Sequence, residues 1–139
     1  YIATTRIPID DLRAKLDEEN RSLDKIQALF RNGEEKQEAW GRLMSLGGLE
    51  VTGALDTNIE VNAGGVHKGA ALCWLAERLG IAREEILAFG DGSNDLKMIR
   101  DAGTGVAMAN AIPEVLEAAD ITAASNDEDG VARVIEEFL

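Results

Sequence analysis

The first half of the chain carries the hydrophobic patterns of both strands and helices. In residues 25–31, Ile26, Ala28 and Phe30 alternate with mostly polar residues, which predicts a half-buried strand of an antiparallel sheet. The neighbouring segments predict two helices and two further strands: helices 10–20 and 34–46, and strands 49–55 and 58–61. Together these elements make an α+β pattern.

The second half alternates between short apolar runs and helical segments. The apolar runs predict buried strands at 86–89, 105–108 and 120–123. Helices are predicted at 68–79, 94–102, 114–119 and 130–139. In the last helix we expect a core stripe of Val131, Val134, Ile135 and Phe138. The alternation is typical of βαβ units and of a parallel sheet covered on both faces, with a ligand crevice at the carboxyl ends of the strands. The predicted fold class is therefore α/β.

Charge and cysteine content exclude several classes of partner. The chain has 26 acidic and 14 basic residues and a formal net charge of −12, which argues against a nucleic-acid partner and an anionic membrane surface. It contains no apolar stretch near the roughly 20 residues that span a bilayer. Cys73 is the only cysteine, which fits a reducing compartment, so we expect a cytoplasmic protein. We expect Cys73 itself to be packed within its helix.

The sharpest candidate for chemistry is the segment Gly90-Asp91-Gly92-Ser93-Asn94-Asp95, between a predicted strand and a helix. Asp91 and Asp95 are expected to converge with Asn94 at the sheet edge, where Mg²⁺ would offset the repulsion of the carboxylates. The alternative is that these are turn and helix-cap residues. An EF-hand is excluded, because Leu96 stands where that calcium loop needs glycine and Ala102 where it needs glutamate.

Two further positions are candidates for binding an anion or a substrate. Lys68 begins a predicted helix, where backbone N–H groups attract phosphate and a lysine would add to that attraction. The neighbouring His67 is expected to be an exposed residue near the helix cap, with a general acid or base as the alternative. Asn110 follows the strand 105–108 and is expected either to line the crevice or to serve as a turn residue. Asp127-Glu128-Asp129-Gly130 is expected to be a capping segment, because no hydrophobic strand precedes it.

These segments resemble the haloacid dehalogenase superfamily of phosphatases, most closely its Cof-type, subclass IIB branch. The matching text, which together covers about residues 58–139, is Gly65-Val66-His67-Lys68-Gly69, residues 86–95, residues 105–111, Ala119-Asp120 and residues 126–132. The resemblance implies that residues 63–139 form the C-terminal half of a Rossmann-like core. It implies that residues 1–62 form the C-terminal half of an α/β cap domain.

The resemblance also implies a role for each candidate residue. Lys68 would stabilise the phosphoryl group, Asp91 would be a Mg²⁺ ligand, and Asp95 would support the metal directly or through water. Asn94 and Asn110 would border the phosphate or the substrate. The implied activity is hydrolysis of a small phosphorylated metabolite, such as a sugar phosphate, through an aspartyl-phosphate.

One motif of that family has no counterpart in these 139 residues. The family's nucleophile and general acid lie in an Asp-x-Asp-Gly-Thr/Ser motif upstream of the cap, and the present sequence contains no such segment. The sequence also begins with Tyr1, and its first methionine is Met44. We therefore expect a truncated chain with negligible activity alone. A non-catalytic binding domain and a phosphomutase of the same superfamily remain alternatives.

Overall fold

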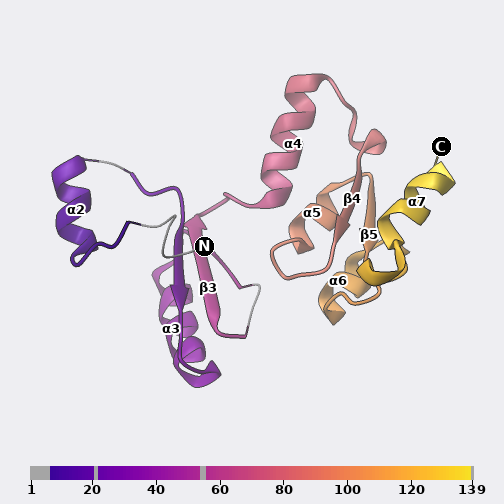
Figure 1. Ribbon diagram of the computed structural model, residues 1–139. Coiled ribbons are helices and arrows are strands. Elements are labelled where there is room, and N and C mark those ends of the chain that lie inside the picture. The colour runs from indigo at the N-terminus through magenta and orange to yellow at the C-terminus, as the bar shows by residue number, and fades with distance from the viewer. Residues whose placement is uncertain (1–6, 21, 54–55, 139) are drawn as a thin grey trace.

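A computed structural model describes residues 7–20, 22–53 and 56–138 (Figure 1). The elements of the first half are α2 (Leu12–Glu19), β1 (Ile26–Leu29), α3 (Gly33–Leu46), β2 (Leu49–Thr52) and β3 (Asn58–Ala63). Those of the second half are α4 (Lys68–Leu79), η1 (Arg83–Glu85), β4 (Leu87–Gly90), α5 (Leu96–Asp101), β5 (Thr104–Ala107), α6 (Pro113–Ala118), β6 (Ile121–Thr122), η2 (Asn126–Glu128) and α7 (Gly130–Phe138).

The first half folds into an antiparallel sheet, called here the first sheet, with strand order β1-β3-β2. Glu50 of β2 lies opposite Asn62 of β3, and Thr52 lies opposite Glu60, so these four polar side chains share one face. Ile59 points to the other face and is fully buried. Helix α3 packs against β2 and β3. The sheet therefore presents a polar face away from its own helix.

The second half forms a parallel sheet with strand order β4-β5-β6. On one of its faces, the last helix contributes to a buried cluster: Val106, Met108, Ala123 and Val134. The other face is covered by α5 and α6, which supply Ile99 and Val115 around Ala107. The parallel sheet is thus covered on both faces, and the predicted α/β fold class is confirmed.

The predicted elements are all present, and they differ from the prediction mainly at their ends. The strand predicted at 25–31 is the four-residue β1, and the strand predicted at 49–55 ends at Thr52, although residues 54–55 lie outside the described part. Helix α4 has the predicted bounds. Element ends are set by tertiary hydrogen bonds, and hydrophobic spacing does not report those.

Two expectations about packing were wrong. In the predicted core stripe of α7, Val134 is buried, but Val131 and Ile135 are each 40% exposed and Phe138 is 56% exposed. Cys73, expected to be packed, is exposed on α4.

Helix α4 has one small buried contact with α5 and an exposed apolar face. Gly69 and Ala76 are the buried residues of α4, and a Cβ on Gly69 would lie 2.9 Å from the Lys97 carbonyl oxygen of α5. Helix α4 therefore approaches α5 closely at Gly69, while Leu75 and Leu79 are exposed. No helix within the described residues is both long and apolar enough to cross a membrane.

Candidate functional site

One cavity of about 520 Å³ is lined by all five residues singled out from the sequence: Lys68, Asp91, Asn94, Asp95 and Asn110. Three parts of the chain supply them: Lys68 begins α4, the segment 91–95 follows β4, and Asn110 follows β5. Strands β4 and β5 are parallel neighbours, so their carboxyl ends meet at one edge of the sheet. The sheet topology therefore brings these residues together.

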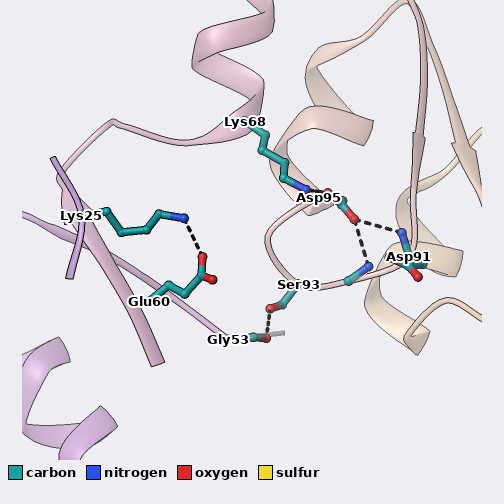
Figure 2. Close-up of polar contacts among 8 residues, drawn as sticks. Lys25, Gly53, Glu60, Lys68, Asp91, Ser93 and Asp95 are labelled. Carbon is teal, nitrogen blue, oxygen red and sulfur yellow. Dashed lines mark hydrogen bonds and ion pairs between the residues drawn. The ribbon is translucent and has the colours of Figure 1, made fainter. Parts of the chain in front are cut away.

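Asp95 organises the loop after β4 (Figure 2). Its Oδ1 is ion-paired with the ammonium of Lys68, and its Oδ2 accepts hydrogen bonds from the backbone N–H groups of Asp91 and Gly92, both at 3.1 Å. The side chain is only 7% exposed. Both oxygens are thus occupied, and Asp95 holds the loop and the lysine in one arrangement.

Gly90 makes room for this carboxylate. A Cβ at Gly90 would lie 2.5 Å from the Cβ of Asp95, a separation that real Cβ atoms essentially never show. The group that approaches this glycine is the Asp95 side chain, five residues further along the chain.

The environment of Asp95 favours its charged form. Burial alone would raise the pKa of this carboxyl, but the hydrogen bonds from Lys68 and from the N–H groups of Asp91 and Gly92 outweigh burial and lower the pKa. At neutral pH the group is therefore a carboxylate. Its charge also compensates for placing the Lys68 cation at the start of a helix, where the macrodipole disfavours it.

Asp91 differs from Asp95 in its exposure. Its carboxylate is exposed, and its Oδ2 accepts a hydrogen bond from the Asn110 side chain at 3.4 Å. The Asn110 oxygen in turn accepts the N–H of Asn126 at 3.3 Å. Asn110 therefore orients Asp91 while leaving this carboxylate open to the cavity.

The donor set fits Mg²⁺ through Asp91. Mg²⁺ is commonly held by one or two protein carboxylates together with water and substrate phosphate oxygens. Among the described residues no group of three or more His, Cys, Asp and Glu side chains is placed to hold a metal. Asp91 and Asp56 are the exposed carboxylates that line the cavity. The role of Asp95 as a metal ligand stays a prediction, and its engaged oxygens favour contact through water.

His67 is the N-cap of α4, and it is half-buried. Its Nδ1 accepts the backbone N–H of Ala70 at 3.1 Å. This side chain therefore satisfies one of the N–H groups that the first turn of a helix leaves without a backbone acceptor. The expected location at the cap is confirmed, but the expected exposure was wrong, because the residue is half-buried. The hydrogen bond fixes the start of the helix one residue before Lys68.

The acidic segment 127–130 lies outside the cavity. Asp127 and Glu128 are in η2, where Glu128 accepts hydrogen bonds from the hydroxyl and the N–H of Ser125 at 2.8 and 3.4 Å. Asp129 adopts a left-handed conformation with φ of 58° just before α7. Neither Asp127 nor Asp129 lines the cavity. The expectation of a capping segment is confirmed.

Sequence reasoning missed the wall that the first half contributes to the cavity. Lys36 of α3, Gly53 and Asp56 line it together with the five predicted residues. The Ser93 hydroxyl donates a hydrogen bond to the Gly53 carbonyl oxygen at 3.0 Å, which joins this wall to the loop after β4 (Figure 2). No local pattern marks Lys36 or Asp56, because their position depends on how the first sheet packs against residues far along the chain.

Several known proteins with related sequences are named phosphatases. A family model described as haloacid dehalogenase-like hydrolase matches residues 3–135. The Bacillus subtilis (strain 168) protein YcsE, a 5-amino-6-(5-phospho-D-ribitylamino)uracil phosphatase by name, is 50% identical over 91 residues, which are 66% of this chain and 36% of YcsE. The chain thus spans about a third of that relative.

Solved structures agree with the sequence matches. A haloacid dehalogenase-like hydrolase from B. subtilis has a TM-score of 0.85 and 32% identity, covering 94% of this chain and 46% of that one. The subclass IIB sugar phosphatase BT4131 has a TM-score of 0.76 and 32% identity, covering 88% of this chain and 45% of that one. The resemblance inferred from the motifs is therefore confirmed, and the chain belongs to the haloacid dehalogenase-like hydrolase family.

Proposed function

We propose that this chain is part of a Mg²⁺-dependent phosphatase that hydrolyses small phosphomonoesters such as sugar phosphates. The observation that carries the proposal is the convergence of Lys68, Asp91 and Asn110 on one cavity. A lysine, an accessible carboxylate and a carboxamide are the groups that a phosphate and its metal ion require. The names of YcsE and BT4131, both phosphatases of small phosphorylated compounds, agree with it.

Each residue has a separate task in this proposal. Asp91 would hold Mg²⁺, which when bound supplies positive charge next to the phosphoryl oxygens. The Lys68 ammonium gives one N–H to Asp95 and has two others for phosphoryl oxygens. Asn94 and Asn110 border the same cavity and would donate to the phosphate or the substrate. Residues 63–139 would be half of the catalytic core, and residues 1–62 half of its cap.

The attacking group would come from outside these 139 residues. In the proposed reaction an aspartate oxygen forms a bond to phosphorus while the ester P–O bond breaks, and a second acid protonates the departing alkoxide. Water then attacks the phosphorus of the aspartyl-phosphate, which releases inorganic phosphate and the free aspartate. The sequence has no Asp-x-Asp-Gly-Thr/Ser segment to supply those two aspartates.

The test compares the 139-residue chain with the product of the longer reading frame that contains it. Both are assayed with a panel of sugar and polyol monophosphates, with Mg²⁺ and with a chelator. We expect Mg²⁺-dependent phosphate release from the longer protein and negligible release from the chain alone. Robust turnover by the chain alone would contradict the proposed external nucleophile. Substrate isomerisation without phosphate release would favour a phosphomutase instead.

A further inference from the structure

Strand β2 and the residue after it contact the segment that follows β4 through an ion pair and a hydrogen bond. The Glu50 carboxylate contacts the Lys97 ammonium through both oxygens at 2.7 Å, and the Gly53 carbonyl accepts the Ser93 hydroxyl at 3.0 Å. Glu50 and Gly53 are three residues apart in the chain, and their partners Lys97 and Ser93 are four residues apart. The segment between Ser93 and Lys97 is therefore held at both ends by the first sheet.

The segment 93–97 contains the group that organises the site. Asp95 lies between Ser93 and Lys97, and its carboxylate binds Lys68 and the N–H groups of Asp91 and Gly92. A displacement of β2 would thus be passed through the segment 93–97 to Asp95. The lysine and the loop of Asp91 would then move with it.

Glu50 also contacts the connection between the two halves. Its Oε1 accepts the N–H of Gly65 at 3.3 Å, and Gly64 donates its N–H to the Gly48 carbonyl at 2.7 Å. Gly65 has φ of 79°, a conformation that favours glycine. One carboxylate therefore joins β2, the link that leads into α4, and helix α5. The hydrogen bond from Lys97 is the largest effect lowering the pKa of Glu50, so the group is charged at neutral pH.

We infer that Glu50 is a positioning residue, whose ion pair with Lys97 latches the first sheet over the cavity and keeps the Asp91–Asp95 loop in register with Lys68. Glu50 does not line the cavity of about 520 Å³; it borders a smaller neighbouring pocket together with Lys68 and Asn94, and its contact with the segment that contains Asp95 runs through Lys97. Its catalytic consequence rests on the proposed function, but the latch itself does not.

The chain contains a matched control for this pair. Lys25 and Glu60 also form an ion pair at 2.7 Å, with side chains 50% and 18% exposed, against 49% and 16% for Lys97 and Glu50. Both partners of the control belong to the first half, since Glu60 lies in β3 and Lys25 precedes β1. Loss of either ion pair removes an electrostatic attraction of similar strength. Only loss of the Glu50–Lys97 pair also removes a contact between the two halves.

The first experiment measures the separation of the two halves without substrate. One spin label is attached to the native, exposed Cys73 of α4 and a second to Gln37→Cys of α3, in the 139-residue chain. Pulsed electron paramagnetic resonance then gives the distribution of distances between the two labels. We expect Glu50→Gln and Lys97→Met to broaden and lengthen the distribution, and the double charge swap Glu50→Lys with Lys97→Glu to restore it. Lys25→Met and Glu60→Gln should leave it unchanged. Circular dichroism melting identifies any variant that fails to fold, and the charge swap then provides the decisive comparison.

An unchanged distribution in Glu50→Gln, or an equal change in the Lys25 and Glu60 variants, would overturn the latch. In the longer protein, Glu50→Gln should lower kcat/KM about three- to fivefold, the size expected of one partly exposed ion pair, and the charge swap should recover it. If no variant, including the parent, releases phosphate, the proposed function fails while the distance result still decides the latch. If the parent is active and Glu50→Gln equals it in kcat/KM, the positioning role is wrong.

Discussion

The ammonium of Lys68 and the carboxylate of Asp95 form an ion pair across 27 residues of sequence, and Asp95 is the partner buried within the loop after β4. The pair joins the start of α4 to that loop, so the helix that carries Lys68 and the loop that carries Asp91 are both held by Asp95. The geometry of the candidate site therefore depends on a residue whose own oxygens are already occupied.

Replacing Asp95 with asparagine should destabilise the fold. The amide keeps the size of the side chain but loses the ion pair and weakens acceptance from two backbone N–H groups. Because the Lys68 side chain is half exposed and solvent screens its charge, we expect a loss of about 1–2 kcal/mol in urea unfolding. Asp127→Asn, at an exposed turn, should change the midpoint little. Equal stability of the two variants would contradict the anchoring role.

Alanine at Gly90 should also destabilise the protein, through steric overlap. The added Cβ would lie 2.5 Å from the Asp95 Cβ, so Asp95 must move, and we expect a cost of about 1–3 kcal/mol. Gly41 of α3 provides the control, because a Cβ there meets nothing within 4 Å. Gly41→Ala should be neutral or stabilising, since alanine favours helix. Thermal melts of both variants test the contrast, and a Gly90→Ala protein as stable as the parent would refute it.

His67 provides a helix cap that can be tested by substitution. Alanine at this position removes the acceptor for the Ala70 N–H and should cost about 1 kcal/mol of stability, whereas asparagine can accept the same bond and should retain most of it. Amide hydrogen exchange at Ala70 gives the local measurement. Faster exchange in His67→Ala than in His67→Asn is expected, and identical exchange would exclude the cap.

The Glu50 latch should weaken in acid. The pKa of Glu50 is lowered in the folded protein, chiefly by the hydrogen bond from Lys97, so its stabilising contribution is present above the ordinary value of 4.5 and is lost as the pH falls through the lower folded-state pKa. Parent and Glu50→Gln should therefore differ in urea midpoint at about pH 7 and converge near pH 3. A difference that grows on acidification would contradict this sign.

Much of the fold was predictable from local sequence pattern, most clearly in the second half of the chain. The runs at 86–89 and 105–108 are apolar on both faces, and glycine-containing loops follow or precede them, so strand type and order were evident. The positions of Asp91 and Asn110 at one sheet edge then followed from parallel topology. What could not be predicted is contact between distant segments, such as that of Lys36, Gly53 and Asp56 with the cavity.

The error at α7 has a related cause. Val131, Ile135 and Phe138 have helical spacing, which predicts an apolar face but does not say whether another layer covers it. In the described part of the chain, Val134 packs against the parallel sheet. Val131, Ile135 and Phe138 are exposed. The hydrogen bond between Ser93 and Gly53 could not be predicted either, because the sequence pattern of a loop does not report which distant residue its hydroxyl contacts.

The most direct test of the proposed site is the effect of Lys68→Met and Asp91→Asn on Mg²⁺-dependent phosphate release by the longer protein. Lys15→Met and Asp17→Asn in α2 are the controls, and they match the two charge changes. If Lys68 binds the phosphoryl group and Asp91 the metal, each site substitution should lower kcat about 100-fold or more, while both controls stay within a few fold of the parent. Folded Lys68→Met and Asp91→Asn proteins with parental kcat would show that the cavity is not the phosphatase site.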